Sequence, residues 1–491
     1  MNYISRFIIG TGLLAGLLVS GGCRKSTLRD DRLLPEDTSL VDAMLILHCN
    51  EMQTKAEASR EELEKQINDL NLFFVHKHYP SPEAPEVRHY YFSSVDVAKR
   101  LKLTNIRLGK YRLYAVANAG GRLCSDSHNP TEPDAVGESF CSMTEDQIKD
   151  LVAEVWEYDL TRADNLAMSS VNENMEIKWA KHEGQDIKDE DIEPISISLE
   201  RRVAKFLFSY ELGEEMTDVL KIKTVGARYV PGRVALFKKN MPTAAEFLTT
   251  DYLYPLVDFG DGSNVGISKE NPVIFYLPEN MQGPVPEITD PKDRNGHLAP
   301  QYASYIFLDG ESTAEDGTQQ QCGFSIYLGE NITDNFDVEG NAYYHVHLQL
   351  NGLDPDDIRI SSLKINVLEP FPDRFKVNEP QEAIVEIVCS NYFYDELQLV
   401  CTAPGARGQG FQVIPVDESG NEGSAFEDVS GTGDFWYNVL LTDDKLGEQR
   451  VKCKVVYTQT QTATPIQMNL MLRSRYGMAT VVDRKNIVVQ P

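Results

Sequence analysis

The chain has 491 residues, of which 75 are acidic and 47 basic, and its formal charge at pH 7 is −28. A surface with this excess of carboxylates repels phosphate backbones and anionic headgroups, so we expect no nucleic acid partner. Hydrophobic residues make up 42% of the chain, which is enough for packed cores and excludes wholesale disorder.

The first 22 residues have the pattern of a bacterial export signal. Arg6 supplies a positive charge, residues 7–19 form a short apolar stretch, and small residues precede Cys23. The alternatives are an ordinary signal peptide and a spanning helix, for which the stretch falls short of the ~20 residues needed. We expect a lipoprotein signal peptide over residues 1–22 and lipidation, including a palmitate-type chain, at Cys23. More than one acyl chain there would anchor the protein stably to the outer membrane.

A charged tether and a strand-rich first domain are expected next. Residues 23–38 have no apolar period and indicate a flexible spacer. Over residues 39–185 we expect a β-sandwich that opens with a strand at Ala43 to Cys49. Thr144 to Gln147 has the sequence of a capping box. The pattern predicts one helix over residues 145–156, with an apolar stripe of Ile148, Leu151, Val152, Val155 and Trp156.

Two further domains are predicted beyond a polar, acidic break at residues 181–194. The second is a β-sandwich over residues 190–365 that opens with one strand at Ile195 to Leu212, and Tyr343 to Leu350 is its clearest alternating strand. Residues 370–491 contain short strands separated by Gly, Pro, Asp and Asn clusters, which predicts an additional C-terminal β-sandwich. The expected fold class is therefore mainly β, with tandem Ig-like sandwich domains and a few short helices.

The cysteines indicate no metal or redox site. Of the eight in the chain, seven remain once Cys23 is lipidated, and none lies in a C-x-x-C pair, so structural zinc and thioredoxin-like chemistry have no support. Cys124 and Cys141 close a short polar loop, and Cys453 lies on the inner side of a predicted strand. A disulfide at either place and plain buried thiols are equally favoured.

No catalytic residue, metal site or cofactor is predicted. His345 and His347 share one face of a strand, but the opposite face is the apolar one, which favours a solvated pair over metal ligands. The acidic groups at residues 354–357 and 189–191 lack the spacing of a calcium loop. Phosphate-binding glycine motifs and a nucleophile elbow are absent from the sequence. Trp179 and Trp436 are candidate ligand contacts, with core packing the favoured alternative.

Four segments carry a family pattern when they are taken in order. Residues 67–75 are similar to a strand of the type I-x-x-L-x-V-x-V-Y/F, and residues 109–120 to the type G-x-Y-x-L-x-A/V-x-A-N. Residues 199–206 form a basic-then-Ala strand, and residues 335–344 are similar to D-F-x-V/I-x-R-N-x-x-Y. In this order, residues 23 to about 365 resemble the Bacteroidales fimbrillin superfamily, the lipoprotein precursors of type V pili and their accessory subunits.

The resemblance implies transthyretin-like β-sandwiches that assemble by strand exchange. Removal of a first strand leaves an apolar groove flanked by unpaired backbone groups, which a strand from the next subunit fills. Here an Arg/Lys-directed protease would cut after Lys55, Arg60 or Lys65. The displaceable strand would be the one that carries Ala43, Leu45, Leu47 and Cys49.

Two departures from the family pattern refine the expected role. Gly340 stands where family members often have Arg, and residues 370–491 form an extra domain where a stalk subunit would end. Ile487-Val488-Val489 is a short candidate for a donated strand. We therefore expect a non-catalytic tip, accessory or anchor subunit of a cell-surface fimbrium, with other fimbrial subunits and a host or bacterial surface ligand as partners. The alternatives are a surface glycan-binding lipoprotein of a polysaccharide-uptake system and an exterior hydrolase.

Overall fold

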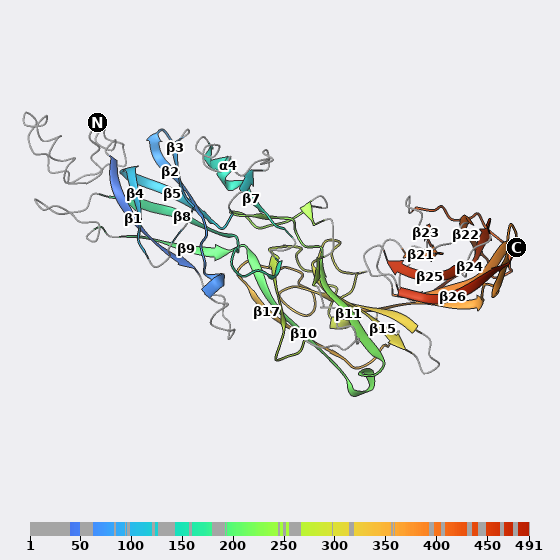
Figure 1. Cartoon of the computed structure of the whole chain (residues 1–491). Helices are drawn as coiled ribbons and strands as arrows, with labels where there is room; N and C mark the ends of the chain where they lie inside the picture. Colours follow the sequence, from blue (N-terminus) through green and yellow to red (C-terminus); the bar gives the residue numbers. More distant parts are fainter. Residues whose placement is uncertain are drawn as a thin grey trace, which may run out of the picture.

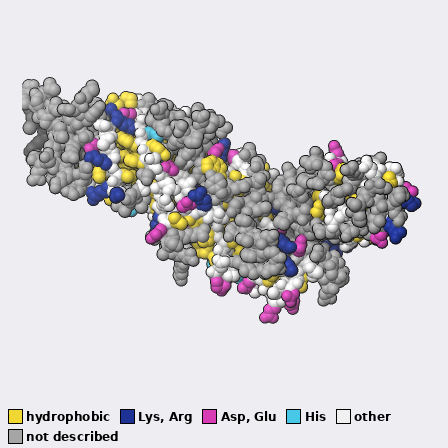
Figure 2. Space-filling model, in the orientation of Figure 1, with side chains coloured by type: hydrophobic (Ala, Val, Ile, Leu, Met, Phe, Trp, Pro, Cys, Tyr) yellow, Lys and Arg dark blue, Asp and Glu magenta, His cyan; other side chains and the backbone are white. Residues whose placement is uncertain are grey.

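The structure is a computed structural model that is mainly β, which confirms the predicted fold class. The molecule is elongated, with β1 near one end and the C-terminal strands at the other (Figure 1). On the face drawn in Figure 2, basic and acidic side chains are interspersed, and apolar side chains form small separate patches. The structure describes residues 40–49, 62–82, 85–93, 95, 99–119, 123–125, 143–156, 160–178, 192, 194–243, 246–248, 252–254, 267–296, 298–313, 319–354, 357, 359–391, 397–403, 408–429, 435–439, 448–461, 466–474 and 480–490.

The first sheet has seven strands in the order β3-β2-β5-β8-β9-β1-β4. β8 and β9 share only two residue pairs, so the sheet folds over at this corner and encloses a core that includes Leu45, Leu72 and Leu113. Its strands are β1 (Leu40–Cys49), β2 (Leu70–Pro80), β3 (Pro85–Phe92), β4 (Leu101–Arg107), β5 (Gly109–Ala117), β8 (Met168–Ile177) and β9 (Ile195–Arg201).

The predicted helix is shorter than expected. α4 spans Glu145–Lys149 and has the predicted capping box, in which the Gln147 N–H donates to Thr144 Oγ1 and the Thr144 N–H donates to Gln147 Oε1. The prediction was wrong beyond Lys149, because Leu151–Glu154 is strand β7 and Trp156 is 43% exposed. The run of consecutive apolar residues suits a strand paired on both sides, and this tertiary pairing overrides the helical period. The partners of β7 are β6 (Leu123–Ser125) and β12 (Arg233–Ala235).

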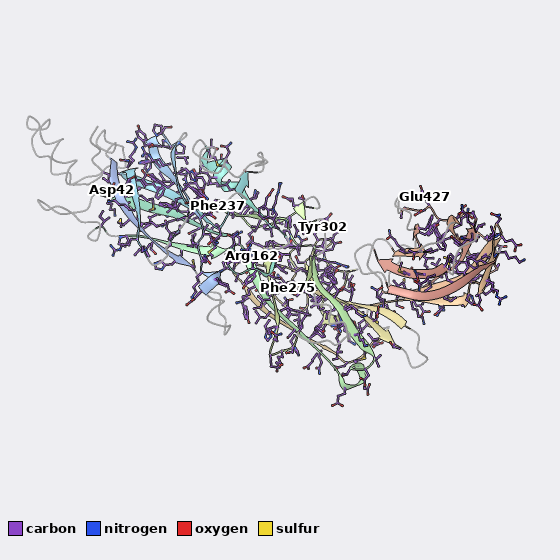
Figure 3. The ribbon with its side chains drawn as sticks, viewed as in Figure 1. Asp42, Arg162, Phe237, Phe275, Tyr302 and Glu427 are labelled. Atoms are coloured by element: carbon purple, nitrogen blue, oxygen red, sulfur yellow. The ribbon has the colours of Figure 1, made fainter. Side chains whose placement is uncertain are left out.

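The second sandwich lies between a three-stranded sheet, β14-β10-β17, and one part of an eight-stranded sheet. Phe206 and Phe275 on the smaller sheet pack with Ile306 and Leu308 on the larger one, and Phe275 is labelled near the middle of Figure 3. The elements are β10 (Val203–Leu212), η6 (Glu214–Met216), β11 (Leu220–Arg228), β13 (Tyr252–Tyr254), β14 (Val273–Pro278), η8 (Pro291–Asp293), β15 (Tyr305–Thr313), β16 (Gln319–Tyr327), β17 (Tyr343–Leu350) and β18 (Ile360–Glu369).

The single strand predicted at Ile195 to Leu212 is two strands in the structure. β9 pairs with β1 and β8 in the first sheet, whereas β10 pairs with β14 and β17 in the second sandwich. The chain crosses between the two at Arg202, where the strand is interrupted. The apolar positions are odd-numbered over residues 195–199 and even-numbered over residues 204–212, so the alternation changes phase across Arg201 and Arg202. This phase change is the signal that the prediction of a single strand missed.

The C-terminal strands continue the eight-stranded sheet, since β18 pairs with β20. They face a five-stranded sheet of order β19-β26-β25-β21-β23 across a core that includes Val385, Leu399 and Val455. The strands are β19 (Arg374–Lys376), β20 (Pro380–Ser390), β21 (Leu397–Thr402), β22 (Gly408–Val416), β23 (Phe435–Asn438), β24 (Glu448–Gln459), β25 (Ile466–Ser474) and β26 (Thr480–Gln490). β26 lies between β19 and β25, so Ile487-Val488-Val489 is part of an interior strand of its own domain.

Candidate strand-exchange site

β1 is an interior strand of the first sheet. It runs antiparallel to β4 and parallel to β9, so that Leu45 is aligned with Leu101 on one side and with Ile195 on the other. Both backbone edges of β1 are therefore used. Without this strand, β4 and β9 would each present a row of unpaired N–H and C=O groups.

Alternate side chains of β1 line the first core. Ala43, Leu45 and Leu47 are at most 5% exposed and belong to this core, and Cys49 packs against it. His48 points to solvent. The four residues predicted to mark the displaceable strand thus share its inner face, and their removal would open an apolar groove.

An ion pair holds β1 near its N-terminal end. Lys102 Nζ lies 3.3 Å from Asp42 Oδ2, and the Asp42 side chain is only 4% exposed. Figure 3 labels Asp42 at the end of the molecule that carries β1. The pair joins β1 to β4 on the face away from the core, so the strand is held by side chains on both of its faces.

The segment after β1 is held by a buried ionic cluster that the sequence did not indicate. Glu64 is 3% exposed, and Glu64 Oε1 accepts hydrogen bonds from Lys205 Nζ at 2.5 Å and from the Tyr276 hydroxyl at 2.7 Å. Arg201 Nε and Nη2 donate to the Glu64 carbonyl oxygen at 3.1 and 2.9 Å. Lys205 is itself fully buried. The cluster therefore joins this segment to β9, β10 and β14 at the junction of the first two sandwiches.

A second carboxylate lies on the other side of the junction. Glu279 Oε1 accepts from Arg202 Nη2 at 2.9 Å, and Glu279 Oε2 accepts from the Gly340 N–H at 3.2 Å. A Cβ at Gly340 would lie 3.0 Å from both Glu279 Oε2 and the Arg201 carbonyl oxygen. Glycine at this position thus lets the loop before β17 approach the junction closely.

Several predicted sites fall wholly or partly outside the described residues. This holds for Cys23, Lys55, Arg60, Cys141, Trp179 and residues 189–191, and for the side chains of Cys124 and Trp436. Cys453 is a free thiol, and burial raises its pKa to about 12. Within the described ranges, no group of three or more His, Cys, Asp or Glu side chains could hold a metal ion. None of the helices described there is long and apolar enough to cross a membrane.

The second sandwich has a groove beside β17, which is the last strand of its sheet among the described strands. The groove has a volume of about 710 Å³, and the half-buried side chains of Tyr344, Val346 and Leu348 line it. His347 Nδ1 lies 2.9 Å from Ser209 Oγ. The alternation of β17 was visible in the sequence, but the groove was not, because its walls come from segments far apart in the chain.

Comparisons with known proteins add one family model and several solved structures. A family described as "Domain of unknown function (DUF4906)" matches residues 275–348, and no relative was found among curated proteins. Similar structures include a "putative cell adhesion protein" from Bacteroides eggerthii, at 14% identity and TM-score 0.39, covering 64% of this chain and 87% of that one. The tip fimbrial protein Mfa3 from Porphyromonas gingivalis, with a C-terminal truncation, is similar at 14% identity and TM-score 0.38, covering 62% and 94%.

The fimbrial anchor protein Mfa2 from Porphyromonas gingivalis is similar at 11% identity and TM-score 0.24, covering 58% of this chain and 80% of that one. The three structures named here are thus those of one cell-adhesion-type protein and two fimbrial proteins.

Proposed function

We propose that this protein is a non-catalytic fimbrial subunit that contributes to adhesion. Its precursor is held at the outer membrane through Cys23 until a cut after β1 releases the body, which then assembles with other subunits by exchanging β1 for a strand from a neighbour. The position of β1 carries the proposal. It is the first strand that the structure describes, it is connected to β2 through one segment, and it fills a groove between β4 and β9. One cut in that segment frees the strand without unthreading any other part of the sheet.

The other end of the chain supports a tip or accessory role. β26 is paired on both sides within its own domain, as β1 is, but the predicted cuts lie beside β1 and none is predicted beside β26. A subunit that accepts a strand but keeps its last strand would end a polymer rather than extend it. The third domain, over residues 370–491, would then provide the surface that contacts a ligand.

N-terminal sequencing of protein purified from cells tests the processing step. A start at Ala56, Glu61 or Gln66 would show that β1 is separated from the body, whereas a blocked, acylated Cys23 on an uncut chain would contradict exchange. Capture of a labelled peptide with the sequence of residues 40–49 by the cut protein tests the groove itself. A matched peptide with Asp at the positions of Leu45 and Leu47 should not bind, because two carboxylates would enter an apolar groove.

A second candidate is the surface glycan-binding lipoprotein, which the groove beside β17 favours. Its volume of about 710 Å³ is in the range of small-ligand sites, and aromatic and polar side chains both line it. Saturable binding on a glycan panel that is lost in Tyr344→Ala and kept in Lys223→Ala, a change at an exposed residue outside the groove, would support this function. Binding that Tyr344→Ala leaves unchanged would exclude this groove as the site.

A further inference from the structure

The segment between β1 and β2 contains a buried carboxylate that strand exchange does not require. Glu64 lies one residue before Lys65, one of the three basic residues at which the sequence predicts processing. Its carboxylate accepts a hydrogen bond from Lys205 on β10, and its backbone carbonyl accepts one from Arg201 on β9. A carboxylate that is 3% exposed is stable in this position only because a cation neutralises its charge and a hydroxyl group donates a hydrogen bond to it.

The Lys65–Gln66 peptide bond is fixed on both of its sides. The Gln66 N–H donates to the Leu63 carbonyl oxygen at 3.0 Å, and the Lys65 carbonyl oxygen accepts from the Cys49 thiol at 3.4 Å. Gln66, directly after this bond, is exposed, and Ile67, the next residue, is 3% exposed. A protease binds its substrate as an extended strand, so this bond can be cut only after the segment leaves its turn.

We infer that Glu64 positions this segment and excludes the Lys65–Gln66 bond from processing, so that β1 is released by a cut on the N-terminal side of Glu64. This inference rests on the proposed release of β1. A cut after Lys65 would let Glu64 depart with the strand and leave the buried Lys205 ammonium without its carboxylate, which is strongly unfavourable. A cut before Glu64 keeps the ion pair in the body, and the junction beside the vacated groove stays neutralised.

Limited proteolysis of the purified full chain with endoprotease Lys-C tests the inference, with mass spectrometry to follow the Lys65–Gln66 bond. The wild-type bond should resist. Glu64→Leu and Lys205→Met each leave a buried charge unpaired, and each should speed this cut on the order of 100-fold. The double variant has no unpaired charge and should return to within about 10-fold of wild type. Glu339→Leu, which removes an exposed pair with Lys239, is the control and should have no effect.

Tyr276→Phe provides a milder variant that keeps the test decisive where a charge variant does not fold. It removes one hydrogen bond to Glu64 and should speed the cut by about 10-fold. Equal cleavage of this bond in wild type and in folded variants would overturn the inference. Rapid wild-type cleavage after Lys65 would overturn it as well.

The proteolysis result is independent of strand exchange. If β1 were never exchanged, the purified monomer would show the predicted cleavage pattern but its cut form would fail to capture the peptide of residues 40–49. If the positioning role were wrong, a chain that begins at Gln66 would capture that peptide as well as chains cut earlier.

Discussion

Leu45→Ala is the sharpest test of the groove that β1 fills. Leu45 is fully buried in the first core and lies between two paired strands, so its neighbours cannot collapse into the space that the substitution creates. A Leu→Ala change at such a site lowers the free energy of unfolding by ~2–5 kcal/mol, and the clamped position favours the upper half of this range. With a urea m value of about 3 kcal/mol/M, a loss of 3 kcal/mol lowers the midpoint by about 1 M.

The same substitution should act on exchange. In a chain cut between β1 and β2, a loss of about 3 kcal/mol from the resident strand should speed its replacement by a wild-type β1 peptide by about 100-fold. His48→Ala is the matched control, since His48 is exposed on the same strand, and it should change stability by no more than about 0.5 kcal/mol. Equal behaviour of the two variants in urea unfolding and in peptide exchange would refute the assignment of β1 as a buried, replaceable strand.

Three further predictions concern the rest of the chain. Burial lowers the pKa of His89 to about 4, so between pH 6.5 and 4 only the unfolded state gains a proton there. The free energy of unfolding should therefore fall by about 2 kcal/mol on acidification through this window, and urea titrations of His89→Gln should show a smaller dependence on pH. Burial raises the pKa of Cys322 to about 11, so iodoacetamide at pH 8 should label it only in urea, and labelling of the native protein would contradict its burial. Gly329→Ala should cost about 1–3 kcal/mol because a Cβ would collide with the Asn335 carbonyl oxygen, whereas Gly352→Ala, which meets nothing, should leave the melting temperature unchanged.

Features set by local pattern could be predicted from the sequence. The alternation of Tyr343 to Leu350 gave the strand β17, and Thr144 with Gln147 gave the start of α4. In both cases the residues that define the structure lie within one element, so their spacing records it. The inner face of β1 could be predicted for the same reason, because Leu45 and Leu47 are two residues apart, which is the side-chain period of a strand.

Features set by contacts between distant segments could not be predicted in this way. The strand β7 replaced the second half of the expected helix because β6 and β12 pair with it on both sides, and the sequence near Leu151 contains no sign of these partners. Glu64 and Lys205 are 141 residues apart in the chain. Each looks like an ordinary surface charge until the fold buries both.

This difference bears directly on how processing would be controlled. Lys55, Arg60 and Lys65 are equivalent to an Arg/Lys-directed protease when only the sequence is considered, since each offers a basic side chain before a peptide bond. In the fold, Glu64, one residue before Lys65, is tied to Lys205 on a strand of the second sandwich. The choice of cleavage position would thus be a property of tertiary structure, and a change at Lys205, far along the chain, should alter where the first strand is released.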